Sequence, residues 1–428
     1  MYYLYNLILT FLLVLLLPVW LIILLSGRKY RAGFKQKTGF LPVALKEKIK
    51  SFARKPVWFH AVSVGETIAV SDLVKEFKYK YPEYPVVFTT VTFTGQEIAK
   101  KRLGEIATIF YFPYDIGFIT RKVIEIIDPC LVVIVETEIW PNFAANLYKK
   151  NIPLLLINGR LSPKSYRNYK FFKPLVSIVL KYFSRFLMQT DLDAKRIIDI
   201  GADKDKVDIT GNLKYDIKKA FTFDQVEDLK NELCLTDADK VIIAGSTHSG
   251  EESIILDVFL KLCRDIHDLK LIIVPRHPER YDEVINILDS SKVSFCRRSL
   301  KNSFKEAPVF LLDTMGELSG FYSIADVAFI GGSIIEKGGH NPLEPAVYSK
   351  PVVIGPHTFN FHEITKYMVE AGAAIQFNDQ EQLYSVLSAL LTDNSYYEKA
   401  QVSCKKVFEA NRGATERTLH VIATYLNE

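Results

Sequence analysis

The sequence predicts an α/β protein built from two doubly wound, Rossmann-like domains. From residue 56 onward, short apolar runs alternate with amphipathic stretches. Apolar runs separated by helices are typical of a parallel sheet that is covered on both faces. A polar, charged stretch at residues 214–240 interrupts the alternation, which then begins again. The length of 428 residues also favours two domains, because it exceeds what one ordinary core supports.

The predicted strands and helices follow one another in order along both halves. In the first half we expect strands at 57–62, 85–92, 107–114, 130–137, 152–159, 186–190 and 206–212, and helices at 67–80, 94–104, 116–128, 141–150 and 191–201. In the second half we expect strands at 240–247, 269–277, 293–298, 307–314, 326–333 and 350–357. Helices are expected there at 224–234, 250–266, 278–290, 315–325 and 341–349, with more after Asp379. Ligands of such folds bind at the carboxyl ends of the strands.

The first 27 residues differ from the rest, because none of them is charged and most are apolar. A helix of this length can cross a hydrocarbon core of about 30 Å. Basic residues follow at 28, 29, 31, 35 and 37, the reverse of the order in a cleavable signal peptide. We therefore expect a membrane anchor at 1–27, single-pass or monotopic, with the domains on the cytoplasmic face. The domains are expected at 28–218 and at 219–428, the second including the C-terminal helices.

Composition and charge exclude several classes of protein. With 49% hydrophobic and 24% charged residues, the chain is globular rather than disordered. A net charge of +5 is too small for a typical nucleic-acid-binding protein, but it suits an anionic substrate or an anionic membrane surface. The five cysteines are scattered and form no C-x-x-C pair, which argues against a disulfide framework and a zinc site.

Two groups of acidic residues in the first half are candidates for chemistry. In SVGE at 63–66, Glu66 follows a predicted strand and begins a helix. Ser63 and Glu66 match a capping box, so a structural role is one interpretation. The alternative is a general base, because the site lies at a strand's carboxyl end and Gly65 permits close approach. In ETE at 136–138, Glu136 and Glu138 end an apolar strand, and period two predicts that both project from one face.

Lys214 in the first half and several candidates in the second half suit an anionic, nucleotide-like ligand. Lys214 and Arg276 each lie at the end of a predicted strand, where a cation can meet an anion. The segment STHSGEE at 246–252 leads into a helix N-terminus, although it is not a Walker loop. The tract GGHNPLEP at 338–345 joins a Gly-rich loop to a helix start that can face a phosphate, and Glu344 is placed to hold a ribose.

The sequence shows no recognisable metal-binding motif. The segment TDLD at 190–193 has the D-x-D spacing of metal–nucleotide sites, but it lies between a strand and a helix, so Asp191 is better explained as an N-cap. The histidines show no zinc spacing.

Taken together, ten motifs resemble one known family, the Kdo transferases (3-deoxy-D-manno-octulosonic acid transferases) of lipopolysaccharide biosynthesis. They occur in the same order, and the resemblance runs from the N-terminal segment to at least residue 365: SVGET, ETEIWPN, NGRLS, GNLKYD, STHSGEE, VPRHPER, DTMGEL, FIGGS, GGHNPLEP and GPHTFNF. The resemblance implies a GT-B glycosyltransferase with an acceptor domain followed by a donor domain. It also implies CMP-Kdo as donor, the acylated disaccharide precursor of lipid A as acceptor, inversion of the anomeric centre, no metal or other cofactor, and a place at the inner membrane.

The resemblance also implies roles for particular residues. Glu66 would be the general base, and Glu136 and Lys214 would stabilise the transition state. The CMP group would contact Pro275, Arg276, Met315, Gly316, Glu317, Asn341, Pro342, Leu343 and Glu344. Alternatives are another membrane-associated GT-B transferase or an epimerase that uses a UDP-sugar, and an inactive binding or scaffold protein. The number of Kdo residues transferred and the oligomeric state stay open.

Overall fold

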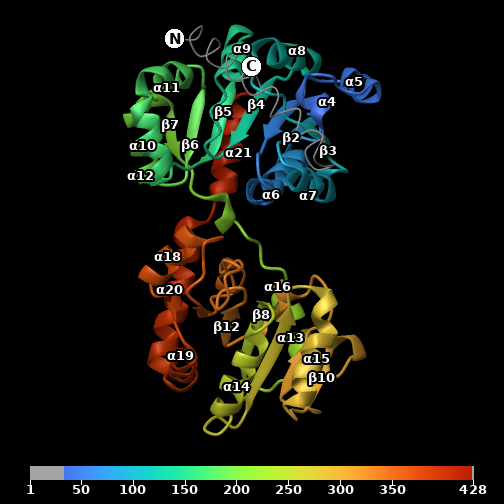
Figure 1. Ribbon diagram of the computed structural model, residues 1–428, viewed down its shortest axis with the longest axis vertical. Coiled ribbons are helices and arrows are strands. Elements are labelled where there is room, and N and C mark those ends of the chain that lie inside the picture. The colour runs from blue at the N-terminus through green and yellow to red at the C-terminus, as the bar shows by residue number, and fades with distance from the viewer. Residues whose placement is uncertain (1–32, 427–428) are drawn as a thin grey trace, which may run out of the picture. The chain divides into compact units, whose positions relative to one another are not determined.

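The computed structural model describes residues 33–426, and these divide into two compact units. The first unit comprises the residues up to Asp216 together with those from Gly413 onward. The second unit comprises Ile217–Arg412. Each unit contains a seven-stranded parallel sheet with helices on both faces (Figure 1). The α/β prediction of two Rossmann-like domains is thereby confirmed.

The sheet of the first unit has the strand order β3-β2-β1-β4-β5-β6-β7. Its strands are β1 (Val57–His60), β2 (Val86–Thr90), β3 (Ala107–Tyr111), β4 (Leu131–Val135), β5 (Leu154–Gly159), β6 (Arg185–Met188) and β7 (Val207–Ile209). In β1, Trp58 packs into one core and Val57 and Phe59 into the other, as a strand covered on both faces requires. Because the chain runs from β1 outward to β3 and returns to β4 beside β1, the topological switch point lies between β1 and β4.

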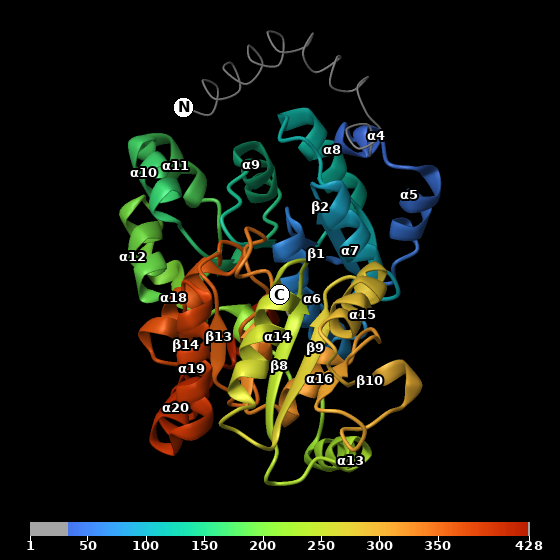
Figure 2. The same ribbon diagram turned by 60° about the horizontal axis from the view of Figure 1, so that its bottom comes forward.

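Helices cover the two faces of this first sheet. One core is filled from α5 (Val43–Lys50), α8 (Gly117–Ile127), α9 (Pro141–Lys149), α11 (Lys173–Leu180) and α12 (Asp191–Asp199). Figure 2 shows α8, α9 and α11 near one another in this layer, and α9 contacts both of the others. The opposite core is filled from α6 (Val64–Lys80), α7 (Phe93–Leu103) and α21 (Ala414–Thr424). The remaining elements are α4 (Phe34–Lys37), α10 (Pro163–Phe171), η1 (Lys204–Lys206) and η2 (Leu213–Tyr215).

The sheet of the second unit has the order β10-β11-β9-β8-β12-β13-β14. Its strands are β8 (Lys240–Thr247), β9 (Leu269–Pro275), β10 (Phe295–Arg297), β11 (Val309–Leu311), β12 (Val327–Ile330), β13 (Val352–Ile354) and β14 (Ala374–Gln376). Its helices are α13 (Phe223–Leu233), α14 (Glu251–Leu262), α15 (Tyr281–Ser290), α16 (Leu318–Phe321), α17 (Leu343–Ala346), α18 (His362–Glu370), α19 (Gln380–Thr392) and α20 (Asn394–Asn411). Short 3-10 turns are η3 (Pro278–Arg280), η4 (Arg298–Leu300) and η5 (Tyr322–Ile324). The switch point lies between β8 and β12, which are neighbours.

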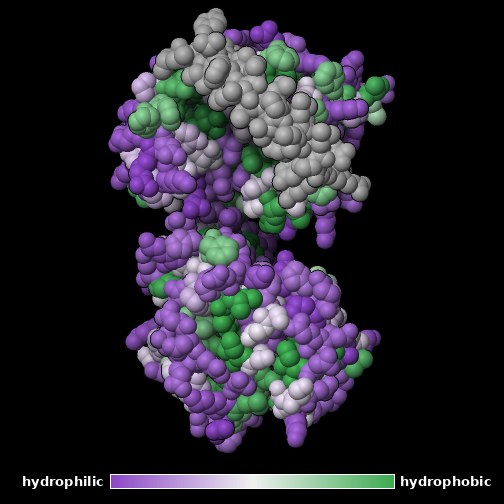
Figure 3. All heavy atoms as spheres, viewed as in Figure 1, coloured by the Kyte–Doolittle hydropathy of each residue, from purple (hydrophilic) through white to green (hydrophobic). Residues whose placement is uncertain are grey.

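Most of the predicted elements are present, but helices α4, α5, α10, α11 and α18 were not predicted, and two further elements differ from the prediction. The helix expected at 341–349 is only the single turn α17, and the chain after it leaves the helical conformation at Ser349, whose φ of 59° is left-handed. Strand β14 was not predicted, since its three residues include one exposed glutamine and form no apolar run. Hydrophilic residues predominate on the face seen in Figure 3, and hydrophobic residues occur there in scattered groups, as expected of solvated domains.

The division into units differs from the predicted one at the C-terminus. The chain passes from the first unit to the second after Asp216, close to the predicted boundary. It returns to the first unit at Gly413, so α21 belongs to the first unit and not, as predicted, to the second. Ala414, Leu419 and Ile422 of α21 are buried against α6 and its sheet. Asp216 accepts a hydrogen bond from Gly413 N (2.6 Å), which joins the two points where the chain passes between the units.

The membrane anchor predicted at residues 1–27 lies outside the described residues. Within residues 33–426, no helix is both long enough and apolar enough to span a membrane.

Candidate functional site

Glu66 lies at the switch point of the first sheet, in the first turn of α6. Ser63 is the N-cap, and its Oγ accepts a hydrogen bond from Glu66 N (3.3 Å). In return the Glu66 carboxylate accepts hydrogen bonds from Val62 N (2.7 Å) and from Ser63 Oγ (2.8 Å). Ser63 is therefore the N-cap as the capping interpretation requires, while the Glu66 carboxylate bonds the backbone of Val62, one residue before the N-cap. This arrangement does not exclude chemistry, because each carboxylate oxygen has a second lone pair.

The surroundings of Glu66 make its carboxylate more basic than usual. Only 8% of the residue is exposed to solvent. Burial raises its pKa, and the nearby charge of Glu136 adds to the rise, while the hydrogen bonds from Val62 and Ser63 oppose it. A buried carboxylate with a raised pKa at the carboxyl end of a strand has the properties of a general base.

Glu136 and Glu138 follow β4, the strand beside β1. Strand β4 ends at Val135, so these residues lie beyond it, and the prediction that strand periodicity orients them was wrong. Glu136 instead takes a left-handed conformation with φ of 60°, which costs energy for a residue other than glycine. Burial, and then the charges of Glu66 and Glu136, raise the pKa of Glu138 to about 7. The three carboxylates therefore form one interacting group.

Lys214 lies in η2, which packs against α6. The buried Asn158, at the end of β5, holds this turn in place, because its Oδ1 accepts a hydrogen bond from Leu213 N (3.0 Å). Asn158 belongs to the NGRLS motif, and it has a left-handed φ of 51°. The first unit thus packs the turn that carries Lys214 against α6, the helix whose first turn contains Glu66.

In the second unit, Pro275 is the last residue of β9, Arg276 follows it, and β8 is a neighbouring strand. Arg276 is exposed, and its backbone N–H donates to Thr247 O (3.0 Å). Burial raises the pKa of Glu344, while the charge of Arg276 and a hydrogen bond from Asn341 oppose that rise. The structure therefore brings Arg276, Asn341 and Glu344 together.

Asn341, Pro342 and Leu343 shape the start of α17. Asn341 Oδ1 accepts a hydrogen bond from Leu343 N (3.2 Å), whereas the side chains of Pro342 and Leu343 are buried. Because α17 is a single turn, it lacks the extended dipole that the predicted phosphate site requires.

Met315, Gly316 and Glu317 form a turn after β11. Met315 is 64% exposed, an unusual position for a large apolar side chain. Gly316 has a positive φ of 90°, with no atom within 4 Å of the place where a Cβ would be. Glu317 is ion-paired with Arg298 (2.9 Å), so its carboxylate already has a partner. This turn offers the Met315 side chain and backbone groups to a ligand.

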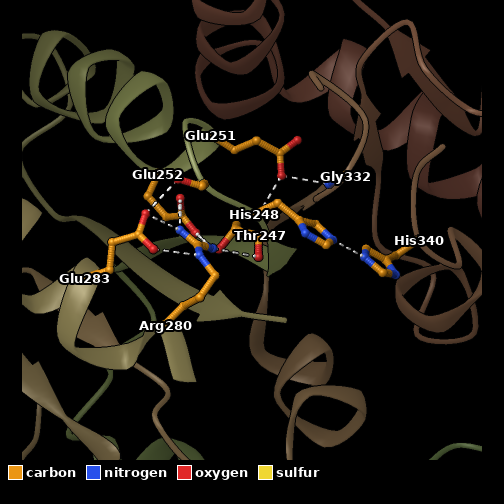
Figure 4. A network of polar contacts seen from close by, with 9 residues as sticks. Thr247, His248, Glu251, Glu252, Arg280, Glu283, Gly332 and His340 are labelled. Atoms are coloured by element: carbon orange, nitrogen blue, oxygen red, sulfur yellow. Dashed lines mark hydrogen bonds and ion pairs between the residues drawn. The ribbon is translucent and has the colours of Figure 1, made fainter. Parts of the chain in front are cut away.

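Three residues outside the predicted set, His248, Glu251 and His340, lie close to one another (Figure 4), and His340 is near enough to Arg276 for its charge to lower the pKa of the ring. The imidazole rings of His248 and His340 are joined by a hydrogen bond between their Nε2 atoms (2.9 Å). The sequence motifs STHSGEE and GGH contain all three residues. His248 and His340 are 92 residues apart in the sequence, so their contact can be predicted only when β8 and β12 are known to be neighbours.

The segment TDLD is structural, although its capping residue is Thr190 and not the predicted Asp191. Thr190 Oγ1 accepts a hydrogen bond from Asp193 N (3.1 Å), and Asp193 accepts one from Leu161 N (2.8 Å).

Comparison with known proteins identifies the family of this chain. Residues 32–217 match the family model described as 3-deoxy-D-manno-octulosonic-acid transferase (kdotransferase). The chain is 38% identical over 374 residues to a 3-deoxy-D-manno-octulosonic acid transferase of Haemophilus influenzae, covering 86% of this chain and 87% of that protein.

Two solved structures are also similar. The C-terminal CMP-Kdo binding domain of WaaA from Acinetobacter baumannii is 35% identical, with a TM-score of 0.41, over 43% of this chain and 96% of that domain. UDP-GlcNAc 2-epimerase from Neisseria meningitidis shares only 16% identity, over 86% of this chain and 100% of the epimerase, with a TM-score of 0.57, so the likeness concerns the fold alone. On the strength of the Haemophilus relative, the chain belongs to the Kdo transferases, a family of glycosyltransferases.

Proposed function

We propose that this chain transfers Kdo from CMP-Kdo to the acylated glucosamine disaccharide precursor of lipid A (lipid IVA), with inversion of the anomeric centre. The observation that carries the proposal is the buried Glu66 at the switch point of the first sheet, next to two further carboxylates, in a member of the Kdo transferase family. An inverting transfer needs a base beside the acceptor, and this group supplies one.

The proposed step is a single displacement. The acceptor's sugar hydroxyl is a weak nucleophile until a base removes its proton, and Glu66 takes that proton as the new bond forms at the ketosidic carbon of Kdo. The bond from that carbon to the phosphate oxygen of CMP breaks, and CMP leaves with the electron pair. Because a phosphate is a good leaving group, the step needs no general acid. Glu136 and Lys214 are proposed to stabilise the charge that develops.

The second unit supplies a site suited to the donor. Arg276 offers a planar set of donors to an anionic group. Glu344 presents acceptor oxygens suited to the ribose hydroxyls. Met315, exposed on its turn, can pack against the face of the cytosine base, for which a polarizable thioether is well suited. We propose that Pro275, Gly316, Glu317, Asn341, Pro342 and Leu343 complete this site.

We also propose that the reaction needs no metal ion and that the protein works at the cytoplasmic face of the inner membrane. The uncharged residues 1–27 and the basic residues after them support this location, since the acceptor carries acyl chains and CMP-Kdo is soluble. Transfer measured with and without EDTA tests the first point, and fractionation of membranes tests the second.

The proposed activity is tested by supplying CMP-Kdo, generated in situ, together with lipid IVA and analysing the products by mass spectrometry. We expect products heavier by one or more Kdo residues, and the masses give their number. Binding of CMP in preference to UDP is expected in parallel. Absence of a Kdo adduct together with tight UDP binding would instead favour a UDP-sugar enzyme of the same fold.

A further inference from the structure

Three neighbouring strands of the second sheet end at one place. Strand β8 lies between β9 and β12. His248 follows β8, Arg276 and His277 follow β9, and the loop that ends at His340 follows β12. The ring centroids of His248 and His277 lie 5.6 Å apart, and those of His248 and His340 lie 5.2 Å apart. The side chains from all three strand ends therefore form one cluster.

Glu251 fixes two of these loops relative to each other. It is the first residue of α14 and is fully buried. Its carboxylate accepts hydrogen bonds from His248 N (3.0 Å) in its own loop and from Gly332 N (2.7 Å) after β12 (Figure 4). It also accepts hydrogen bonds from the backbone N–H groups of Ser333 (3.0 Å) and Ile334 (3.0 Å). One carboxylate thus holds the backbone on both sides of the histidine pair.

The hydrogen bond between the two rings determines where their hydrogens lie. Burial, followed by the positive charge of Arg276 and the nearby His248 and His277, lowers the pKa of His340 to about 4, and the pKa of His248 is also lowered by burial. Both rings are thus neutral at pH 7, so each carries one N–H. One ring donates its Nε2 hydrogen to the other. The accepting ring must therefore carry its hydrogen on Nδ1, where a ligand can accept it.

The groups around the pair favour an anion. Arg276, His277 and Lys337 are exposed beside it, whereas the charge of Arg280 is balanced by Glu252 and Glu283. The carboxylates in the same region have partners. Glu251 accepts four backbone N–H groups, and Glu252 (2.7 Å) and Glu283 (3.0 Å) are ion-paired with Arg280. Glu279 lies 3.9 Å from His277, and Glu344 accepts a hydrogen bond from Asn341. A phosphate would therefore meet donors and cations rather than an unpaired carboxylate.

We propose that the His248–His340 pair contacts the phosphate of the CMP group, donating the Nδ1 hydrogen of the accepting ring while Arg276 supplies charge. This inference rests on the proposed function and adds two residues to the donor site. The pair gives a neutral, directional donor that Glu251 holds in place, so that it is already oriented when the bond to the phosphate oxygen breaks.

The test compares CMP with cytidine, which lacks the phosphate, by calorimetric titration of the full-length protein in detergent. His340→Ala and His248→Ala each remove one ring of the pair, and His267→Ala is the matched control, because His267 is exposed between α14 and β9. We expect either substitution in the pair to weaken CMP binding roughly ten- to a hundredfold, the effect of losing a hydrogen bond to a charged group, and to leave cytidine binding unchanged. The control should match the wild type.

Each other outcome has a distinct meaning. Unchanged CMP affinity in both variants overturns the inference, and so does an equal loss for CMP and cytidine, because the pair would then shape the site without contacting the phosphate. If the wild type binds UDP but not CMP, the proposed donor is wrong instead. Circular dichroism checks folding, and if one variant unfolds, the other still tests the pair.

Discussion

Glu66 shows how one side chain combines two roles that the sequence presents as alternatives. Its carboxylate completes the cap of α6 through Val62 and Ser63. The same contacts hold it in one orientation, which is what a base needs when it must meet a hydroxyl. These hydrogen bonds lower the pKa of the carboxylate, but burial raises the pKa by more. The capping contacts therefore orient the proposed catalytic group.

Glu138 should make stability depend on pH. Its pKa rises from an ordinary 4.5 to about 7, so between these values the folded protein holds a proton that the unfolded chain releases. Stability is therefore fully present below about pH 4.5 and is lost as the pH rises to about 7. Glu138→Gln removes the charge, and we expect it to stabilise the first unit by about 1–3 kcal/mol at pH 8 and by little at pH 5. Guanidinium unfolding at both pH values checks this, and an equal effect at both would contradict it.

Substitutions at Glu136 distinguish the effect of backbone strain on stability from the effect of the carboxylate on activity. At the φ of 60° that Glu136 adopts, glycine is unstrained whereas alanine is not. Both Glu136→Gly and Glu136→Ala remove the carboxylate, so both should lose most transfer activity. Glu136→Gly should nevertheless be more stable than Glu136→Ala by about 1 kcal/mol. Equal stability of the two variants would show that the left-handed conformation is not retained.

Among the secondary-structure elements, those that bury an apolar run were predictable and those set by tertiary contacts were not. The sequence LVVIV of β4 is buried at every position and reads directly as a strand. In contrast, the turn at Glu136 and the pairing of His248 with His340 depend on which strands are neighbours. The order of the strands in a sheet cannot be predicted from any local sequence pattern. The place of Glu66 in the first turn of a helix was predictable because SVGE lies at a strand-to-helix junction. Glu251 was not singled out, because its four backbone partners include three about eighty residues away.

The glycine in SVGE offers a test at the level of helix α6. Gly65 was expected to permit close approach of another group, yet a Cβ there would have only Ser63 Oγ as a neighbour, at 3.9 Å. Its backbone does not have a positive φ. Gly65→Ala should therefore stabilise the first unit by about 0.5 kcal/mol. Destabilisation measured by thermal unfolding would contradict this. A loss of activity without destabilisation would show that the space is needed by the acceptor.

The path of the chain through both units gives a further prediction. Because α21 returns to the first unit, its apolar face completes that core although it is distant in sequence. Leu419→Ala should destabilise the first unit by about 2–5 kcal/mol and leave the second unchanged. Hydrogen exchange resolved by mass spectrometry should then show faster exchange in α6 and unchanged exchange in α14. Faster exchange in α14 alone would contradict the assignment of α21.

The proposed reaction depends on Glu66 accepting a proton, and Glu66→Gln removes that ability while keeping the shape of the side chain. Kdo transfer to lipid IVA by this variant, measured beside the wild type with folding and CMP binding as controls, is the decisive experiment. We predict a folded variant that binds CMP normally and transfers Kdo at least about a hundredfold more slowly. A near-normal rate would contradict the proposal, reduce Glu66 to a helix cap, and make Glu136 and Glu138 the next candidates for the base.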